Sequence, residues 1–280
     1  MSDPRRPVWL PSEALRRHAN RTATGDPEVD WLTHVRRRHL AVPPRRVLVL
    51  GAGAGFLELA LSRHFPGARI VGIDGDAEAI RHARDRAARR GLARVVHEVR
   101  SLDRDPLPDG KWDAVFGESV LQRVEDPERL CRSVHDALAP DGRVVLSEFA
   151  DVSDTAASPR WNETLRRFVR VLPIGLRFDP ETGLPFPRDL RESPGDSAGT
   201  PAALDVARAA FVEDGLYRGG GGLLQPLLAP ALSRNLRLDG LDERLLGFLG
   251  ASERDLQARG LVADVFAIFV GRPRAASRMT

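Results

Sequence analysis

The sequence contains little of several residue types that mark particular classes of protein. It has a single cysteine, Cys131, among 280 residues, which excludes a disulfide framework and a zinc site built from cysteines. No apolar run approaches the roughly 20 residues that cross a bilayer, and the first residues lack the apolar stretch of an export signal. We therefore expect a soluble protein of the reducing cytoplasm, without a membrane partner.

Lysine is almost absent as well. Lys111 stands alone among 42 basic residues, and arginine supplies the rest. The isoelectric point of about 9.9 suggests nucleic-acid binding, but the net charge is only +3 and acidic residues are mixed among the arginines. Even the run Arg36–Arg38 falls in a helical pattern that places it toward water. No nucleic-acid partner is therefore expected.

The central part of the chain alternates between two kinds of apolar pattern. With 42% hydrophobic residues, the chain can bury the core of one large domain. Between residues 46 and 149, short Val- and Ile-rich runs alternate with amphipathic helical segments. Such an order predicts an α/β fold with a doubly wound, mostly parallel sheet and helices on both faces. The expected strands are 46–50, 69–73, 95–99, 112–117, 143–149 and 263–270, with a short segment at 216–217 that is not assigned. The expected helices are 13–18, 27 or 28 to 40, 56–64, 77–90, 125–138, 159–171, 201–214, 223–232 and 241–259.

A long segment after the fifth expected strand interrupts this alternation. Residues 173–201 are rich in proline, glycine and charge, and a loop of this length in a compact protein is usually either a functional flap or a disordered segment. Because it follows a strand, we expect it to cover the carboxyl edge of the sheet. The predicted organisation is a helical N-terminal lid at 1–44, a ligand-binding core at 45–150, a lid or substrate insertion with helices at 151–260, a final core strand at 261–271 and a loose tail at 272–280.

A glycine-rich turn follows the first expected strand. Gly51, Gly53 and Gly55 form the pattern GxGxG, in which glycines permit positive φ and let the backbone approach a ligand. The next helix presents free N–H groups to that ligand. Asp74 ends the second strand, where a carboxylate can accept hydrogen bonds from both hydroxyls of a ribose. Asp76 is better placed to cap the following helix, which leaves Asp74 for the ligand.

Four segments carry a resemblance to a known family. VLVLGAGAG, IVGIDGDAEAI, DPLPDGKWDAVFGESVLQRVEDP and LAPDGRVVLSEF are similar to the ordered motifs of class I S-adenosylmethionine-dependent methyltransferases. The resemblance implies a Rossmann-like seven-stranded sheet, S-adenosyl-L-methionine as cofactor, S-adenosyl-L-homocysteine as product, and no metal. It places the following residues at the cofactor: Gly51, Ala52, Gly53, Gly55, Asp74, Gly75, Ser101, Leu102 and Glu118.

The sequence departs from the family's motifs at two positions. Val49 stands two positions before the first glycine, where the family often has an acidic residue, so the methionine ammonium group needs another partner. At the adenine position, where an aspartate is common, the sequence has Ser101 and Leu102, and Asp103 comes later. Ser101 can still hydrogen-bond the adenine edge.

Catalysis of methyl transfer makes modest demands on the side chains. The reaction is an in-line displacement from a sulfonium, so alignment and exclusion of water supply much of the rate. A general base is needed only for an acceptor such as a hydroxyl. The candidates are Glu118, Gln122 and His18, with Glu148 at the same edge of the sheet. Glu118 can serve equally as base or as partner of the methionine ammonium. No His, Asp or Glu cluster has metal-ligand spacing, so no metal is expected.

We expect a methyltransferase that acts on an O, N or C atom of a small-molecule acceptor, a secondary metabolite. Three alternatives stay open. A nucleic-acid or protein methyltransferase would need a segregated basic groove or a target-recognition module. An NAD-dependent oxidoreductase would prefer a small residue at the position of Phe56. A methyltransferase-like binding protein without activity is the third. The acceptor and the formation of a homodimer are left open by the sequence.

Overall fold

The computed structural model of the chain describes residues 12–149, 159–174, 177–178, 183, 203–224 and 240–274. Most of the lid predicted at 173–201, and nearly all of the helix predicted at 223–232, lie outside these residues.

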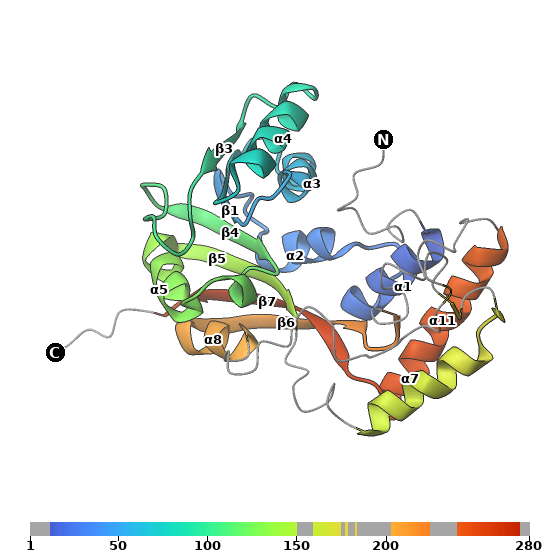
Figure 1. Cartoon of the computed structure of the whole chain (residues 1–280). Helices are drawn as coiled ribbons and strands as arrows, with labels where there is room; N and C mark the ends of the chain where they lie inside the picture. The colour runs from blue at the N-terminus through green and yellow to red at the C-terminus, as the bar shows by residue number, and fades with distance from the viewer. Residues whose placement is uncertain are drawn as a thin grey trace. The chain divides into compact units, whose positions relative to one another are not determined.

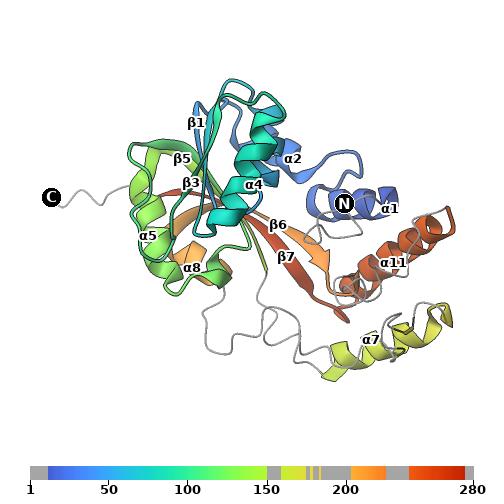
Figure 2. The same ribbon diagram turned by 45° about the horizontal axis from the view of Figure 1, so that its top comes forward.

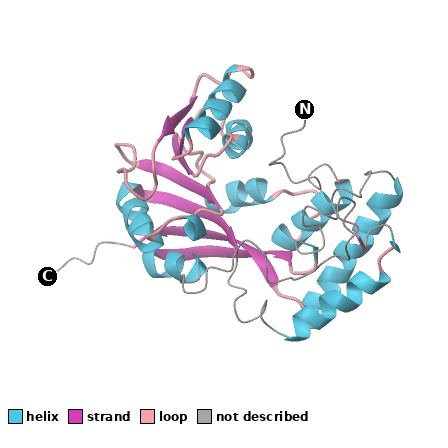
Figure 3. Cartoon of the chain, viewed as in Figure 1, coloured by secondary structure: helices cyan, strands magenta, loops and turns pink. Residues whose placement is uncertain are grey.

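Seven strands form one sheet in the order β3-β2-β1-β4-β5-β7-β6 (Figures 1 and 3). Parallel pairing joins β1 to β2 and to β4, β2 to β3, and β4 to β5. This confirms the predicted doubly wound, mostly parallel, seven-stranded sheet. The strands are β1 (Arg46–Leu50), β2 (Arg69–Asp74), β3 (Val95–Val99), β4 (Trp112–Glu118), β5 (Leu138–Phe149), β6 (Phe211–Gly221) and β7 (Asp264–Pro273).

The strand order determines which face of the sheet each crossover helix covers. The chain moves from β1 through β2 to β3 in one direction, and from β4 to β5 in the other. Right-handed crossovers therefore place α3 and α4 on one face and α5 on the other, and α8 packs beside α5 (Figures 1 and 2). The helices are α1 (Glu13–Thr24), α2 (Trp31–His39), α3 (Phe56–His64), α4 (Ala77–Ala88), η1 (Leu121–Arg123), α5 (Pro127–Ala137), α7 (Pro159–Val171), α8 (Ala203–Ala210) and α11 (Gly240–Ala258).

Side-chain caps explain where two of the crossover helices begin. The carboxylate of Asp76 accepts hydrogen bonds from the first amides of α4, as its position in the sequence predicts. Asp126 caps α5 in the same way and is followed by Pro127 at the first turn. The helix predicted for 125–138 is therefore two residues too long at its start, and Leu138 already belongs to β5.

The helix predicted for 201–214 is wrong in its last four residues. It ends at Ala210, and residues 211–221 form β6. Asp214 forms ion pairs with Arg143 at 2.6 Å and with Arg272 at 3.1 Å, from two other strands. These pairs, together with the burial of the Phe211 side chain, outweigh the local helical pattern because strand formation depends on cross-strand partners.

The chain divides into two compact units, and the division passes through β6 and β7. Unit 1 comprises Met1–Asp30, Ala150–Ala198 and Arg218–Phe266, and unit 2 comprises Trp31–Phe149, Gly199–Tyr217 and Ala267–Thr280. Within unit 1, α1 packs against α11, and Glu243 accepts a hydrogen bond from the amide of Ala14 at 2.7 Å. Trp161 of α7 donates its indole N–H to the carbonyl oxygen of Gly222 at 2.7 Å. None of the helices in the described part of the chain is both long enough and apolar enough to span a membrane.

Candidate functional site

The predicted cofactor residues meet at the carboxyl ends of β2, β1 and β4 in unit 2. Leu50, the last residue of β1, lies opposite Ile73 of β2 and Gly117 of β4. The residues that follow these positions, Asp74 and Glu118, therefore flank the start of the glycine turn. The strand order reverses direction between β1 and β4, and such a switch point is where open α/β sheets bind their ligands.

The glycine turn has the backbone conformation that only glycine adopts without strain. Gly51, Gly53 and Gly55 have φ angles of 64°, 49° and 80°. A Cβ atom added at Gly53 would find no other atom within 4 Å, so the backbone of the turn faces open space. Ala52, between the first two glycines, is buried. The turn therefore offers an exposed stretch of backbone to a ligand.

Asp74 holds this turn from the neighbouring strand. Its Oδ2 accepts a hydrogen bond from the amide of Gly53 at 2.8 Å, and its Oδ1 accepts one from the amide of Asp76 at 2.9 Å. A carboxylate has about four lone-pair positions, so two remain after these bonds. Asp74 thus orders the turn and still has acceptor capacity for a pair of hydroxyl groups.

The loop after β3 is ordered by three side chains, of which two, Asp105 and Arg129, are not among the residues that the sequence pattern indicated. The carboxylate of Asp105 accepts a hydrogen bond from the amide of Ser101 at 2.7 Å, and Arg129 of α5 donates to the carbonyl oxygen of Leu102 at 2.6 Å. Asp103 accepts from the amide of Glu125 at 2.7 Å. The spacing of Ser101 and Asp105 was a usable local signal, whereas the contact with Arg129 depends on the packing of α5. Gly75 faces this loop, because a Cβ there would lie 3.7 Å from the Cα of Ser101.

Two carboxyl groups lie at the ends of β4 and β5. Removal of water around the carboxyl of Glu118 raises its pKa, although part of this side chain faces solvent. Glu148 is buried, and burial raises its pKa to about 7 while hydrogen bonds from Val120 and Leu121 act in the opposite direction. Gln122, in the short helix η1, is half-buried nearby in the chain. The edge therefore holds acidic groups that retain a proton more readily than exposed carboxyls.

A second buried acid lies beneath the glycine turn. Glu58 of α3 is fully buried and stands 3.6 Å from the Nε2 of His97 on β3. Burial raises the pKa of Glu58 to about 8 and lowers that of His97 to about 4. A Cβ at Gly72 would overlap the Glu58 carboxyl, and one at Gly55 would lie 3.2 Å from His97. Both glycines thus leave room for this pair, and burial favours the neutral form of each group.

His18, a catalytic candidate from the sequence, has its partners within unit 1. Its Nε2 lies 2.8 Å from Glu253, and its Nδ1 lies 2.9 Å from the guanidinium of Arg254. Glu253 also accepts hydrogen bonds from the amides of Gly221, Leu223 and Leu224. Both ring nitrogens of His18 are therefore engaged in holding α1, α11 and the glycine-rich segment 219–224 together, and its catalytic role stays a prediction.

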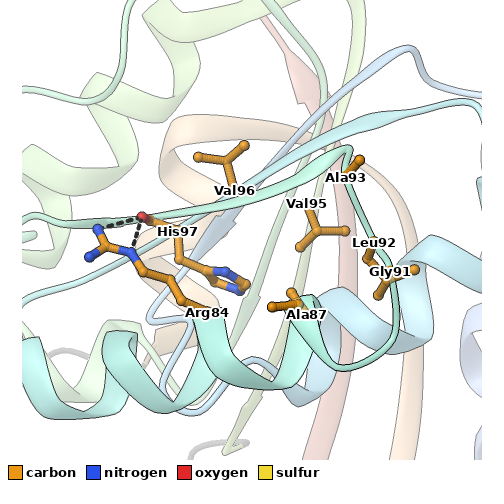
Figure 4. A pocket seen from close by; sticks show the side chains of 9 residues that line it. Arg84, Ala87, Gly91, Leu92, Ala93, Val95, Val96 and His97 are labelled. Carbon is orange, nitrogen blue, oxygen red and sulfur yellow. Dashed lines mark hydrogen bonds between the residues drawn. The ribbon is translucent and has the colours of Figure 1, made fainter.

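A hollow of about 470 Å³ lies elsewhere in unit 2, between α4 and β3 (Figure 4). Its wall contains Ala87, Leu92, Val95 and other small apolar side chains, and Arg84 closes one end by donating two hydrogen bonds to the carbonyl oxygen of His97. This hollow borders the outermost strand and contains none of the predicted cofactor residues.

The glycine turn and its neighbours have the space and the acceptor groups that a nucleoside with a cationic group needs. Open space beside Gly53 accommodates a ligand against the backbone, and Asp74 has acceptors left for ribose hydroxyls. Glu118 follows Gly117, which pairs with Leu50 directly before the turn. Among the described residues, no group of His, Cys, Asp or Glu side chains is arranged to hold a metal ion. The fold is Rossmann-like, and the arrangement of the turn and Asp74 is typical of domains of this fold that bind a nucleoside.

Comparison with known proteins makes this class more specific. Residues 48–144 match the family model of a methyltransferase domain. The demethylmenaquinone methyltransferase of Thermus thermophilus is 35% identical over 134 residues, which are 46% of this chain and 59% of that protein. The chain therefore spans less than two thirds of the length of this relative. Residues 48–144 are therefore similar to a methyltransferase domain, in agreement with the resemblance that the sequence motifs carry.

Two solved structures share the fold over nearly the whole chain. The 4+2 cyclase SpnF has a TM-score of 0.53 at 19% identity, covering 96% of this chain and 94% of its own. The O-methyltransferase of a trans-AT PKS multienzyme of Brevibacillus brevis, in complex with S-adenosyl-L-homocysteine, has a TM-score of 0.51 at 14% identity, covering 93% and 71%. At these identities the likeness shows the fold alone.

Proposed function

We propose that the protein is an enzyme that transfers the methyl group of S-adenosyl-L-methionine to an O, N or C atom of a small-molecule acceptor. The observation that carries the proposal is the open GxGxG turn held by Asp74 at the switch point of the sheet. When bound, the cofactor supplies a methyl group activated by the positive charge of its sulfonium.

Different residues of unit 2 bind different parts of the cofactor. Asp74 accepts hydrogen bonds from the ribose hydroxyls, and the loop that contains Ser101 and Leu102 lies against the adenine. Glu118 is the partner of the methionine ammonium, because Val49 supplies no charge at the position where the family often has an acid. A cation beside Glu118 favours its ionised form and so opposes the raised pKa that this carboxyl has without a ligand.

Titration calorimetry with S-adenosyl-L-homocysteine and with NAD⁺ separates this proposal from the oxidoreductase alternative. We expect binding of the first ligand and none of the second. The variant Asp74→Ala should weaken binding by roughly 1.5–3 kcal/mol, the usual scale for hydrogen bonds to a charged group. Asp85→Ala, at an exposed position on α4, is the control. Unchanged affinity in Asp74→Ala, or preferential binding of NAD⁺, would contradict the proposed function.

A second candidate is a methyltransferase-like protein that binds the cofactor without transferring a methyl group. It is favoured by the likeness to SpnF, a protein of similar fold that is named a cyclase, and by the engagement of His18 with Glu253. Incubation with methyl-labelled S-adenosyl-L-methionine and a panel of hydroxyl, amine and carbanion acceptors distinguishes the two. Tight cofactor binding with no labelled product from any acceptor class would favour the second candidate.

A further inference from the structure

The buried carboxyl group of Glu148 holds the backbone of the loop that follows β4. Its Oε1 accepts hydrogen bonds from the amides of Val120 at 2.8 Å and Leu121 at 3.2 Å, although 28 residues separate Glu148 from Val120 in the chain. The side chain is only 1% exposed. Its Oε2 is buried without a hydrogen-bond partner in the described part of the chain. One carboxyl group thus accepts from the amide of Val120, the N-cap of η1, and from the amide of Leu121, its first residue.

The loop held in this way contains a strained residue. Ser119 has a φ of 52°, the only described non-glycine residue with positive φ. Its amide donates to the carbonyl oxygen of Ser147 at 2.8 Å, in the strand that also carries Glu148. Such a conformation persists only where the surrounding contacts enforce it, and it is found most often at functional sites. Ser147 bonds the amide of Ser119 itself, and Glu148 bonds the amides of the two residues that follow it.

Val120 links the hydrogen bonds of Glu148 to the glycine turn, because its amide bonds Glu148 and its side chain lies against Gly51. A Cβ atom at Gly51 would lie 3.2 Å from the Cγ2 of Val120, and one at Gly117 would lie 3.1 Å from the same atom. The side chain of Val120 therefore rests on the first glycine of the turn and on the last buried residue of β4. A shift of the Val120 backbone would move this contact and the orientation of Glu118 together.

We propose that Glu148 is a positioning residue that, through the amides of Val120 and Leu121, sets Glu118 and Gln122 against the glycine turn. This inference rests on the proposed function, because it assigns the turn and Glu118 to S-adenosyl-L-methionine. Glu148 touches neither the cofactor nor the acceptor in this scheme. It acts by holding the backbone that presents the groups which do.

The charge of Glu148 should change near neutral pH. Burial raises its pKa to about 7, and the titratable or charged groups that face it are Glu118, Arg123 and Cys131. The pKa of Cys131 is raised to about 12, chiefly by burial, so its thiol stays neutral. An ionised carboxylate accepts N–H hydrogen bonds more strongly than a neutral carboxyl. The loop should therefore be held more tightly above pH 7 than below it.

The first test needs no ligand. Hydrogen–deuterium exchange of the peptide that covers residues 119–123 is compared in the wild type, Glu148→Gln and Glu148→Ala near pH 6 and near pH 8, after correction for intrinsic exchange. We expect the protection to increase with pH in the wild type but not in Glu148→Gln. Protection should fall by about tenfold or more in Glu148→Ala, the scale set by loss of a hydrogen bond to a buried charged group. If Glu148→Ala does not fold, the pH dependence of protection in Glu148→Gln alone tests the inference. The amide oxygen of glutamine can still accept hydrogen bonds from Val120 and Leu121 but does not ionise.

The second test measures the affinity for S-adenosyl-L-homocysteine at the same two pH values. The wild type should bind several-fold more tightly near pH 8 than near pH 6, and this difference should shrink in Glu148→Gln while the control Glu128→Gln, exposed on α5, keeps it. Equal pH dependence in the wild type and Glu148→Gln, with unchanged exchange of residues 119–123, would overturn the inference and leave the proposed function standing. Absence of binding by the wild type would instead overturn the proposed function and, with it, the assignment of the clamp to a cofactor.

Discussion

Replacing Glu58 by glutamine tests whether the acid beneath the glycine turn is neutral in the folded protein. Glu58 is fully buried 3.6 Å from His97, and no side chain in the described part of the chain neutralises it by a hydrogen bond. Burial raises its pKa from 4.5 to about 8. Glutamine has nearly the same shape, stays neutral at every pH, and can donate a hydrogen bond toward His97.

The size of the effect follows from the two pKa values. In the unfolded chain Glu58 loses its proton above pH 4.5, whereas the folded protein retains it until about pH 8. The folded state therefore binds more protons across this interval, and its stability falls as pH rises, by about 1.4 kcal/mol per pH unit. At pH 7 the total is about 3 kcal/mol relative to a residue that does not ionise. Above pH 8 the loss levels off.

Urea unfolding of the wild type and Glu58→Gln between about pH 6 and pH 8 measures this directly, with the fluorescence of the buried Trp112 among the reporting signals. The stability of the variant minus that of the wild type should increase by about 2 to 3 kcal/mol across the interval. Glu78→Gln, at an exposed position on α4, controls for the loss of a carboxyl group. Parallel pH profiles for the wild type and Glu58→Gln would show that Glu58 is ionised in the folded protein and would refute the reasoning.

Two further predictions concern packing in each unit. Gly72→Ala should destabilise the protein by about 3 kcal/mol in urea unfolding, because its Cβ would overlap the carboxyl of Glu58. The control Gly67→Ala, at a position with open space, should change the stability little. Equal stability of the two variants would contradict this prediction. Glu253→Ala should destabilise unit 1 by about 3 kcal/mol, since it leaves His18 and three backbone amides of the segment 219–224 without their buried acceptor. Unchanged proteolytic resistance of α11 in that variant would count against it.

The regular part of the fold could be predicted because its signals are local. Strands β1 and β3 and helices α3 and α7 have the bounds that their apolar periodicity predicts. The glycines at 51, 53 and 55 permit positive φ, and all three adopt it. These features depend on residues within a few positions of one another, which a single sequence displays in full.

Strand β6 shows where local reasoning stops. Residues 211–214 continue a helical pattern, yet they lie in a strand whose Asp214 pairs with Arg143 and Arg272. The periodicity of a segment cannot predict these partners, because they lie in β5 and β7, far away in the sequence. For the same reason, the sequence did not predict that Arg129 of α5 bonds the loop that contains Ser101 and Leu102.

By itself, the sequence determined the alternating strands and helices, the glycine turn and the place of Asp74 beside it, since parallel strands that end in sequence-defined turns must meet at one edge of the sheet. Only the tertiary structure decided that Asp74 binds the turn, that Glu148 clamps the loop after β4 and that Glu58 lies against His97. Each of these depends on burial and on partners from other elements, and burial is also what moves the pKa of a carboxyl group away from its value in water.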